Sequence, residues 1–575
     1  MDKLVINFCK EFDEAVIENK NIKLIDLSNV CQKENIDYIF DVEQHLDIYF
    51  KVFDQLYKND PFRNYEVCGY PIFHLTNLSE KHSEKHWLID FSKLLTLIKL
   101  NNNLLKRYKV IEIHSPIIIK KNELFIKRYL EKYGLKHTTF FKYYGRLPNR
   151  INILLKSLIV ASKYLRFLFS NKEFKDKGND FLFINFEKNN PKLFPALKNT
   201  FSLRNKNLSL INLHFWTEKN SAKNVNYHFS RLTMKFAFIF KFLKEISSFL
   251  LLKKRYCDLN IEGLKLRSFF VIDEIYYSLS GYFYLELIIS FNLLKNCFSN
   301  LDSPINIFYE GEFYISGKCI SLSKSKSQNR SMIRTYGVQH GHIHKYQTLY
   351  TFTNYEVESN IPAPDFFIIW GKYYEEILTK NNVSKVTSLL KLGSPVHFEI
   401  NQIDKKYKNL KQKIKYLWCL TNYSKFITEL KILKNSVLWE DAEIKIRQHP
   451  GHKFLNHDKC LRLGIPENMV LNDSTTLTED IVRADCILTT WFSTTIIDAL
   501  VNETVVVALS DYLYKSSLDG TGVPILSSSQ QLNDLFLKDF KNDLKFSQEK
   551  ILSDIIINDP SKLIEHFFND GKEIN

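Results

Sequence analysis

The chain has 575 residues, 45% of them hydrophobic and 25% charged, which is the balance of a globular protein long enough for two or more domains. Its net charge of +15 predicts an anionic partner: nucleic acid, anionic lipid, or a charged sugar and its nucleotide. A low-GC genome, which enriches Lys, Asn and Ile, is the competing explanation of that charge.

The nine cysteines are scattered, odd in number and without a CxxC pair. This argues against a disulfide framework and against a thiolate zinc site, and it favours a reducing compartment. The N-terminal stretch MDKLVINFCKEFDEAV meets acidic residues before any apolar segment long enough for a secretory signal. The sequence therefore predicts a cytoplasmic protein.

The first part of the chain alternates extended and helical patterns. NIKLIDL (21–27) and KVIEIHSPIII (109–119) are typical of buried strands. Residues 90–108 and 122–134 carry apolar side chains at helical spacing. Strands alternating with helices of this length predict βαβ units and a parallel sheet.

Two basic and apolar segments follow, at 151–169 and 236–256. The first is interrupted by Lys156, Lys163 and Arg166, each of which would cost about 2.5–3.5 kcal/mol near the centre of a bilayer. A spanning helix is therefore not expected. The segments are either core helices with snorkelling lysines or helices that lie on an anionic membrane surface.

From residue 179 onward the strand pattern resumes, and a proline-punctuated boundary follows near 360–372. After it, apolar strands and helical signals alternate to the end of the chain. We predict an α/β protein with two Rossmann-like domains facing a cleft. The expected domains are residues 1–365, with helical insertions at about 150–175 and 236–256, and residues 366–575.

Ligands of open parallel sheets bind beyond the carboxyl ends of the strands, so the polar residues after each strand are the candidates for a site. EIKIRQ is followed by HPG, and DCILTT by WFSTT and a helix. Hydroxyls at a helix N-terminus suit a phosphate, although helix capping alone explains them too. The candidates at these two strand ends are Arg447, His449, Pro450, Ser493, Thr494 and Thr495.

The order IRQHPGHK, then ADCILTTWFSTTIIDALVNETVVVAL, resembles the C-terminal half of GT-B glycosyltransferases of bacterial surface polysaccharide biosynthesis. It is similar to those that use CMP-activated ulosonic acids, whose HP and Ser/Thr motifs grip the nucleotide. Many GT-B enzymes carry Glu in an S-T-x-x-E-A pattern, whereas this chain has Asp498 before Ala499. That departure argues against a UDP-sugar donor.

IFYEGEFYISGK, YGVQHG, DFFIIWGKYYEEIL and LKLGSPV follow one another as in a set of surface-carbohydrate biosynthesis proteins, so the resemblance covers roughly residues 180–530. It implies a CMP-sugar donor, a glycan or lipid-linked glycan acceptor, and no metal or cofactor. A peripheral position on the inner face of the cytoplasmic membrane would suit such an acceptor. The further donor-binding residues expected from it are Gln339, His340, Gly341, Gly371, Lys372, Gly393 and Ser394, together with Asp498.

The loop YGVQHGHIH presents His340, His342 and His344 within five residues. A metal site would need carboxylate or further imidazole partners, and the next acidic residue after Glu312 is Glu356. We therefore expect a loop at the interdomain cleft that contacts the donor or the acceptor.

Transfer of an ulosonic acid needs a base for the acceptor hydroxyl and a donor to the leaving phosphate. Glu310 follows the strand INIFY and is the expected base, with Glu312 as second choice, while His449 is expected to serve the phosphate. A solvated turn carboxylate is the alternative interpretation of Glu310. Competing functions are CDP-glycerol or CDP-ribitol phosphotransfer, UDP-sugar transfer, and a non-enzymatic basic membrane adaptor. No RNA-binding or helix-turn-helix signature points to nucleic acid.

Overall fold

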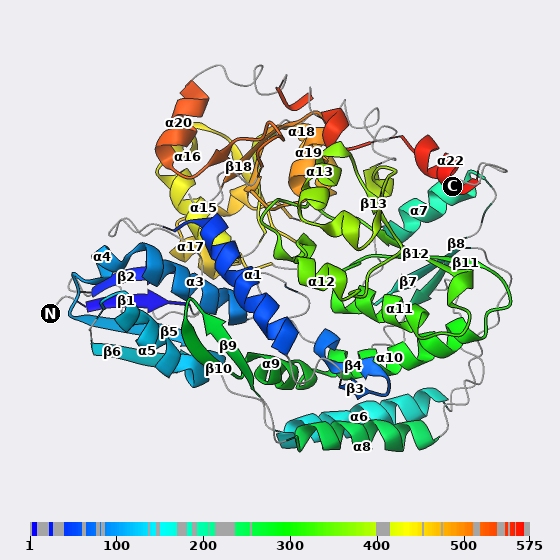
Figure 1. The fold of residues 1–575 in the computed structure, drawn as a ribbon. Helices are drawn as coiled ribbons and strands as arrows, with labels where there is room; N and C mark the ends of the chain where they lie inside the picture. Colours follow the sequence, from blue (N-terminus) through cyan, green and yellow to red (C-terminus); the bar gives the residue numbers. More distant parts are fainter. Residues whose placement is uncertain are drawn as a thin grey trace.

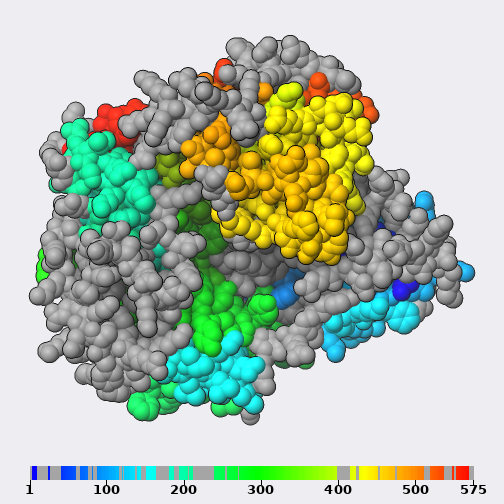
Figure 2. Space-filling model, turned by 180° about the vertical axis from the view of Figure 1, so that it is seen from behind, coloured from blue at the N-terminus to red at the C-terminus, as the bar shows by residue number. Residues whose placement is uncertain are grey.

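The computed structural model contains three parallel β-sheets, which follow one another along the chain, and Figures 1 and 2 show it from opposite sides. We call them the N-terminal, middle and C-terminal sheets. The described residues are 3–8, 22–26, 40–59, 65–75, 81, 87–135, 138–144, 150–168, 181–186, 193–204, 206, 208–212, 236–252, 256–397, 414–421, 423–450, 453–472, 475–509, 518–537, 547–549, 552–557 and 559–568.

The N-terminal sheet has four strands in the order β2-β1-β5-β6. Its central strand β1 is buried over Leu4, Val5 and Ile6, because helices cover both faces of a parallel sheet. The predicted strands at 21–27 and 109–119 are thereby confirmed. The strands are β1 (Lys3–Asn7), β2 (Ile22–Asp26), β5 (Val110–Pro116) and β6 (Thr138–Tyr144), and the helices are α1 (Val42–Asn59), α3 (Trp87–Leu100), α4 (Asn102–Leu105) and α5 (Glu123–Lys132).

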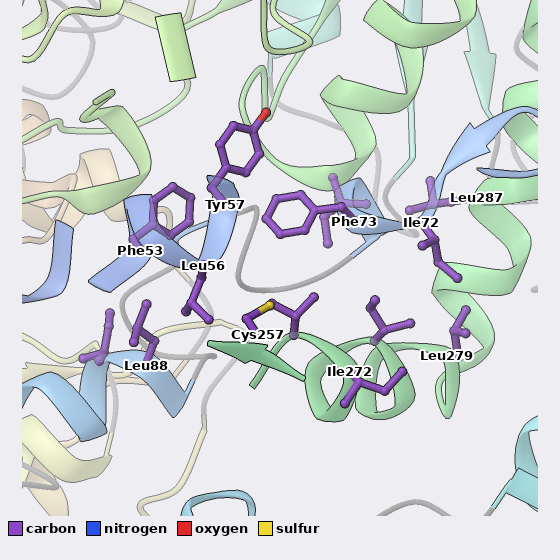
Figure 3. Close-up of a cluster of buried hydrophobic side chains, with 14 of the residues drawn as sticks. Phe53, Leu56, Tyr57, Ile72, Phe73, Leu88, Cys257, Ile272, Leu279 and Leu287 are labelled. Carbon is purple, nitrogen blue, oxygen red and sulfur yellow. The ribbon is translucent and has the colours of Figure 1, made fainter. Parts of the chain in front are cut away.

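A hydrophobic core joins this sheet to helices that come much later in the chain (Figure 3). Helix α1 contributes Phe53, Leu56 and Tyr57, each of which is at most 4% exposed. They pack with Cys257 of the antiparallel hairpin and Ile272 of α9. The further elements of this region are β3 (Glu66–Val67), β4 (Tyr70–Pro71), β9 (Cys257–Ile261), β10 (Leu264–Ser268), α9 (Phe270–Leu279) and α10 (Tyr282–Ser299).

The middle sheet has six parallel strands in the order β14-β13-β12-β11-β7-β8. Strand β13 pairs with β12 and β14 pairs with β13, so one continuous sheet runs through residues 360–372. The expected boundary at 365/366 is therefore wrong as a division between sheets. The strands are β7 (Phe181–Asn185), β8 (Leu208–Asn212), β11 (Ile305–Tyr309), β12 (Ile333–Val338), β13 (Phe366–Ile369) and β14 (Ser388–Lys391).

The C-terminal sheet has five parallel strands in the order β16-β15-β17-β18-β19. The chain passes to it only after β14, because every residue that pairs in it lies beyond 413. Its strands are β15 (Ile414–Cys419), β16 (Ile444–Arg447), β17 (Ala484–Thr490), β18 (Val505–Leu509) and β19 (Ile525–Leu526), and its helices include α15 (Tyr423–Lys434), α17 (His457–Arg462), α18 (Leu477–Arg483), α19 (Thr495–Val501) and α20 (Ser529–Leu537).

The chain then returns to the middle sheet. The Ile557 amide donates to the Trp370 carbonyl at 2.8 Å, and the Ser394 amide donates to the Ile557 carbonyl at 3.3 Å. Helix α22 (Ser561–Phe568) packs its Leu563 into a cluster with β7, β11 and β12. The end of the described chain thus belongs to the middle sheet, as Figure 1 shows by the red helix beside α7 (Leu193–Ser202).

The two basic and apolar segments form helices α6 (Arg150–Leu168) and α8 (Phe236–Leu250), which lie side by side at one end of the molecule (Figure 1). The predicted helices are confirmed over these ranges, while the end of the first insertion (169–175) and the basic run at 253–255 lie outside the described residues. A search of the described helices finds none that is both long and apolar enough to cross a bilayer.

The expected fold class is confirmed. The middle and C-terminal sheets are both parallel α/β units of the Rossmann type, and the loops after their strands meet at one cleft. The N-terminal sheet is an additional unit that the sequence did not separate from the middle one.

Candidate functional site at the interdomain cleft

Glu312 lies in the turn between β11 and α11 (Ile315–Ser325), at the carboxyl end of the middle sheet, and its side chain is fully buried. Its Oε1 accepts a hydrogen bond from the Tyr350 hydroxyl at 2.7 Å. Among the described residues, its Oε2 has no hydrogen-bond partner. Burial raises the pKa of Glu312 to about 8, since removal from water disfavours the charged form. Glu310 is half-buried in the same turn, and its charge raises that pKa further.

The three histidines of the loop after β12 point to three different partners. His340 Nδ1 lies 3.9 Å from Glu312 Oε2, His342 Nδ1 lies 3.1 Å from the Tyr374 hydroxyl, and the His344 ring contacts Trp491 edge-on at 4.6 Å between centroids. The described part of the chain contains no group of three or more metal-ligating side chains suited to one ion. The three side chains thus take part in separate contacts within the protein.

Desolvation keeps these imidazoles neutral. Burial lowers the pKa of His342 to about 4 and that of His344 to about 3. It also lowers the pKa of His340 to about 4, although this side chain is 34% exposed at the cleft. Of the three histidines, His340 is therefore the one whose neutral ring can contact a ligand at pH 7.

Gln339 holds this loop in place. Its backbone amide donates to the Ile368 carbonyl at 2.9 Å, and its side-chain carbonyl accepts from the Trp370 amide at 3.0 Å. The Trp370 indole donates back to the Gln339 carbonyl at 2.9 Å. Because Gln339 is only 1% exposed and its side chain bonds both to the Trp370 amide after β13 and to the Gly341 carbonyl of the loop, it positions the loop instead of reaching a ligand.

The loop reaches across to the C-terminal sheet. A Cβ built on Gly341 would lie 3.4 Å from Thr494 Oγ1, and Lys345 pairs with Asp519 at 3.3 Å. Thr494 is at the N-cap position of α19 but makes no side-chain cap hydrogen bond, whereas Ser493 Oγ accepts from the Thr495 amide at 3.3 Å. The structure therefore brings the predicted loop and the predicted hydroxyl cluster together.

A second polar link joins the two sheets behind this contact. Ser394 Oγ lies 2.6 Å from His397 Nδ1, and His397 Nε2 lies 3.0 Å from Asp498 Oδ1. Ser394 is fully buried, so the triad connects β14 to α19 and does not present a nucleophile. His397 directly follows the LKLGSPV pattern, but nothing in the sequence marks it as a partner of Asp498.

At the carboxyl end of β16, Arg447 and His449 behave differently. The Arg447 guanidinium pairs with the buried carboxylate of Asp480 and donates to the Thr475 carbonyl at 3.0 Å. These contacts direct Arg447 to helix α18, which is a structural role. His449 and Pro450 are exposed, and β15 separates their strand from β17, which places them about 10 Å from the Thr490 end.

The remaining predicted residues line the ends of β13 and β14. Lys372 is exposed, and its Nζ lies 3.7 Å from Glu376. Gly393 has φ +89° and leads into the buried Ser394. Gly371 is needed for close packing, because a Cβ there would lie 2.5 Å from the Ile555 carbonyl oxygen of the returning chain. The sequence pattern located these positions, but the contact with residues 554–557 depends on tertiary structure.

Seen from behind, the surface is hollowed between the yellow and orange segments of the C-terminal sheet and the green segments of the middle sheet (Figure 2). Where the two sheets face each other, the loops after β11, β12 and β17 supply one buried carboxyl, one partly exposed imidazole and several hydroxyls. Such an arrangement can bind an anionic ligand and move a proton.

No protein-family model and no curated protein matches the sequence. Solved structures with a similar fold include the UDP-GlcNAc 2-epimerase of Neisseria meningitidis bound to UDP-GlcNAc, with a TM-score of 0.40 and 11% identity over 67% of this chain and 98% of that chain. Others are MurG of Acinetobacter baumannii (0.36, 9%, 68% and 99%) and the glycosyltransferase SnogD of Streptomyces nogalater (0.36, 9%, 67% and 98%). At these identities and TM-scores the likeness carries no argument about substrate or reaction. The middle and C-terminal parallel sheets of the chain itself define its GT-B-like fold.

Proposed function

We propose that the protein is a metal-independent glycosyltransferase that moves an ulosonic acid (Kdo, sialic or another nonulosonic acid) from a CMP donor to a hydroxyl of a bacterial surface glycan. The observation that supports it is the meeting of the loop 339–344 with the hydroxyl cluster 493–495 at the cleft. The resemblance of the HP and Ser/Thr motifs supplies the donor class.

In this proposal the Ser493 and Thr494 hydroxyls bind the nucleotide, and His449 donates a hydrogen bond to the leaving phosphate oxygen. The acceptor hydroxyl attacks the anomeric carbon while the bond to the phosphate oxygen breaks. A base must take the hydroxyl proton. The candidates follow β11 and β12 at their carboxyl ends: Glu310, Glu312 and His340. Position directly after β11 alone favours Glu310 as the base.

A nucleotide panel tests the donor class. We expect CMP to raise the unfolding temperature of the full chain more than CDP or UDP does, because ligand that binds only the folded state stabilises it. Transfer from CMP-Kdo and CMP-sialic acid should follow. Preferential stabilisation by CDP would favour a glycerol- or ribitol-phosphate transferase, and a lack of response to all three would favour the membrane adaptor.

UDP-sugar transfer is the second candidate. Asp498 departs from the Glu of the S-T-x-x-E-A pattern, but its position at the cleft favours this candidate. One oxygen of this carboxylate is held by His397, and the side chain is still 26% exposed at the cleft. A carboxylate here could accept a hydrogen bond from a donor sugar hydroxyl. If UDP stabilises the wild-type chain and Asp498→Asn abolishes that effect while CMP has none, the UDP-sugar candidate replaces the first.

The role of His449 has its own test. His449→Ala should weaken CMP binding and also lower turnover, because a contact present in both the ground state and the transition state is lost. His457→Ala is the matched control, since His457 begins helix α17 of the same domain, has a side chain that is 73% exposed and pairs with Glu467. Unchanged CMP affinity in His449→Ala would remove His449 from the donor site.

We also propose that helices α6 and α8 rest on an anionic membrane surface, where lipid-linked acceptors are built. Four apolar side chains form one exposed stripe of α6: Ile151 (61%), Leu155 (53%), Leu158 (53%) and Ile159 (41%). Phe240 of the adjoining α8 is 72% exposed. Arg150, Lys241 and Lys244 are exposed around them. Basic residues beside an apolar helix face suit an anionic leaflet, at about 1 kcal/mol each.

Sedimentation with vesicles that contain anionic phosphatidylglycerol tests this. Leu155→Ser with Leu158→Ser should lower vesicle binding, and the binding of wild type should fall with salt. Leu461→Ser is the control, because Leu461 is 75% exposed on α17 of the C-terminal sheet. Equal losses in both variants, or binding unaffected by either, would refute the proposal.

A further inference from the structure

We propose that the catalytic base of the proposed transfer is His340, with Glu312 as the positioning residue that orients its ring. The inference rests on the proposed function and narrows it to one proton-transfer pair. It starts from the Glu312 Oε2 atom, which is buried and lacks a hydrogen-bond partner among the described residues.

Buried carboxyl oxygens are normally hydrogen-bonded, so an unpartnered one needs an explanation. On the cleft side, His340 Nδ1 lies 3.9 Å from this oxygen. Catalytic hydrogen bonds are often long in a protein without substrate and shorten in the complex. A shift of about 1 Å would bring the two atoms to hydrogen-bonding distance.

In this pair Glu312 lies inside the protein, and His340 lies towards the cleft. Glu312 is fixed from inside by the Tyr350 hydroxyl at 2.7 Å, and Gly337 of β12 packs directly against it. His340 is 34% exposed, and a Cβ on Gly341 beside it would lie 3.4 Å from Thr494 Oγ1. His340 therefore stands between a buried carboxyl and the proposed donor site, which is where a base must meet the acceptor hydroxyl.

In the proposed step, the ionised Glu312 accepts from Nδ1–H, which leaves the lone pair of Nε2 free. Nε2 takes the proton of the acceptor hydroxyl as its oxygen bonds to the anomeric carbon. The bond from that carbon to the phosphate oxygen breaks, and its electron pair leaves with CMP. The imidazolium, balanced by Glu312, then releases its proton to water.

The environment of Glu312 makes this step pH-dependent. The groups that face it are Glu310 of the same turn, Tyr309 of β11, Tyr350 and His340, with Tyr314 near Tyr350. None of them is a fixed cation, and burial raises the pKa of Glu312 to about 8. The ionised, base-competent pair therefore increases as the pH rises through that value.

The kinetic test compares His340→Ala, Glu312→Gln and Glu310→Gln in the full chain. His340→Ala should keep nucleotide affinity and lose about 10²–10⁴ in kcat, with partial rescue by added imidazole. Glu312→Gln should lower kcat and abolish the rise of kcat/KM with pH, whereas Glu310→Gln should keep that rise and shift it to lower pH, because the charge of Glu310 helps to raise the pKa of Glu312. Loss of nucleotide affinity in proportion to activity would make His340 a donor-binding residue and overturn the proposal.

A spectroscopic test is independent of turnover. In ¹⁵N-histidine spectra at alkaline pH, assigned with His340→Gln, the neutral His340 ring should carry its proton on Nδ1, and Glu312→Gln should shift it to Nε2. A proton on Nε2 in both proteins would refute the pair. An inert wild type with the Nδ1–H tautomer would refute the proposed function and leave the pair intact.

Discussion

At the residue scale, the cleft depends on close packing between strand β12 and the turn that carries Glu312. Gly337 lies in β12 beside Glu312, and a Cβ on Gly337 would lie 2.5 Å from the Glu312 Cβ. Real Cβ atoms do not approach so closely, so the strand and the turn can pack only with glycine here. The position of Glu312 is therefore determined by a residue on a neighbouring strand.

Gly337→Ala should thus disturb the turn that carries Glu312. We expect a loss of about 1–3 kcal/mol in the free energy of unfolding, the usual cost of overpacking, measured by urea denaturation. Gly341→Ala is the matched control, because its Cβ would meet Thr494 Oγ1 at an ordinary 3.4 Å. A Gly337→Ala chain as stable as Gly341→Ala would contradict the packing argument.

The sequence predicted part of the site for a physical reason. Strand ends are visible in a hydrophobic pattern, so the loop 339–344 and the hydroxyls 493–495 could be placed beforehand. The partners of these residues could not. Asp480 takes Arg447 away from the cleft, and His397 reaches Asp498 across 101 residues. Such pairings arise from tertiary packing, which a single sequence does not display.

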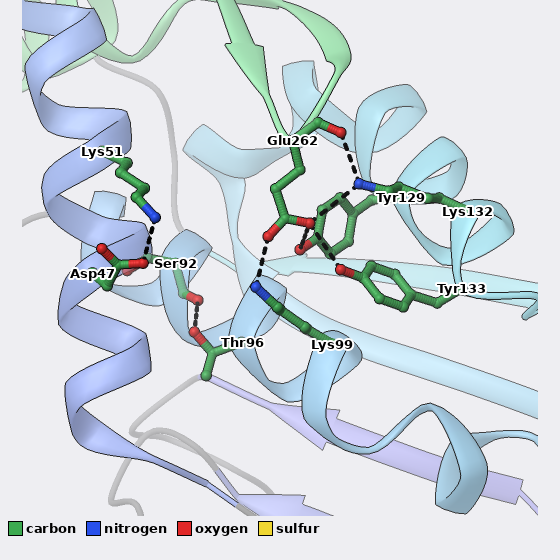
Figure 4. Close-up of polar contacts among 9 residues, drawn as sticks. All are labelled: Asp47, Lys51, Ser92, Thr96, Lys99, Tyr129, Lys132, Tyr133 and Glu262. Carbon is green, nitrogen blue, oxygen red and sulfur yellow. Dashed lines mark hydrogen bonds and ion pairs between the residues drawn. The ribbon is translucent and has the colours of Figure 1, made fainter.

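At the element scale, the tip of the β9–β10 hairpin is fastened to the helices of the N-terminal sheet by one carboxylate (Figure 4). Glu262 accepts from Lys99 at 2.9 Å, from Tyr133 at 2.8 Å, and from Tyr129 and Lys132 at 3.2 Å each. Despite partial burial, these donors hold the pKa of Glu262 at about 2.

Glu262→Gln should therefore destabilise the chain at neutral pH. The folded pKa lies below the unfolded value of about 4.3, so the stabilisation is present above that pH and is lost as the pH falls towards 2. After allowance for a side chain that is 27% exposed, we expect roughly 1–2 kcal/mol.

The measurement is the difference in unfolding temperature between wild type and Glu262→Gln, which should shrink from pH 7 to about pH 3. Asp47→Asn is the control shown in the same view, since its pair with Lys51 is a solvent-exposed i,i+4 contact at 2.6 Å. A surface pair of this kind contributes little. A pH-independent difference for Glu262→Gln would argue against the charge as its cause.

At the scale of the whole molecule, the order of the sheets in space does not follow a simple division of the chain. The proline boundary at 362–364 predicted that β13 and β14 belong to the second half of the chain. Both strands instead complete the middle sheet. The final helix α22 returns to the same sheet. Hydrophobic periodicity identifies strands but not the sheet to which each belongs, because pairing partners are set by long-range contacts.

This return makes the middle sheet dependent on the last residues of the described chain. Leu563 is fully buried against β7, β11 and β12, and Phe567 stacks edge-on with Phe308 at 5.2 Å between centroids. Leu563→Ala removes buried side-chain volume that the rigid sheet cannot refill, which costs about 2–5 kcal/mol in well-packed cores. The loss should fall on the sheet that α22 covers.

Native-state amide hydrogen exchange shows which sheet loses stability in the Leu563→Ala chain. Leu563→Ala should speed exchange in residues 181–185, 305–309 and 333–338, while residues 484–490 and 505–509 of the C-terminal sheet keep the wild-type rates. Leu532→Ala is the reciprocal control, because Leu532 of α20 is equally buried but packs in the core of the C-terminal sheet. It should speed exchange there and spare the middle sheet. If Leu563→Ala instead speeded exchange in the C-terminal sheet, α22 would stabilise that sheet and not the middle one. This result would contradict the packing of α22 on the middle sheet.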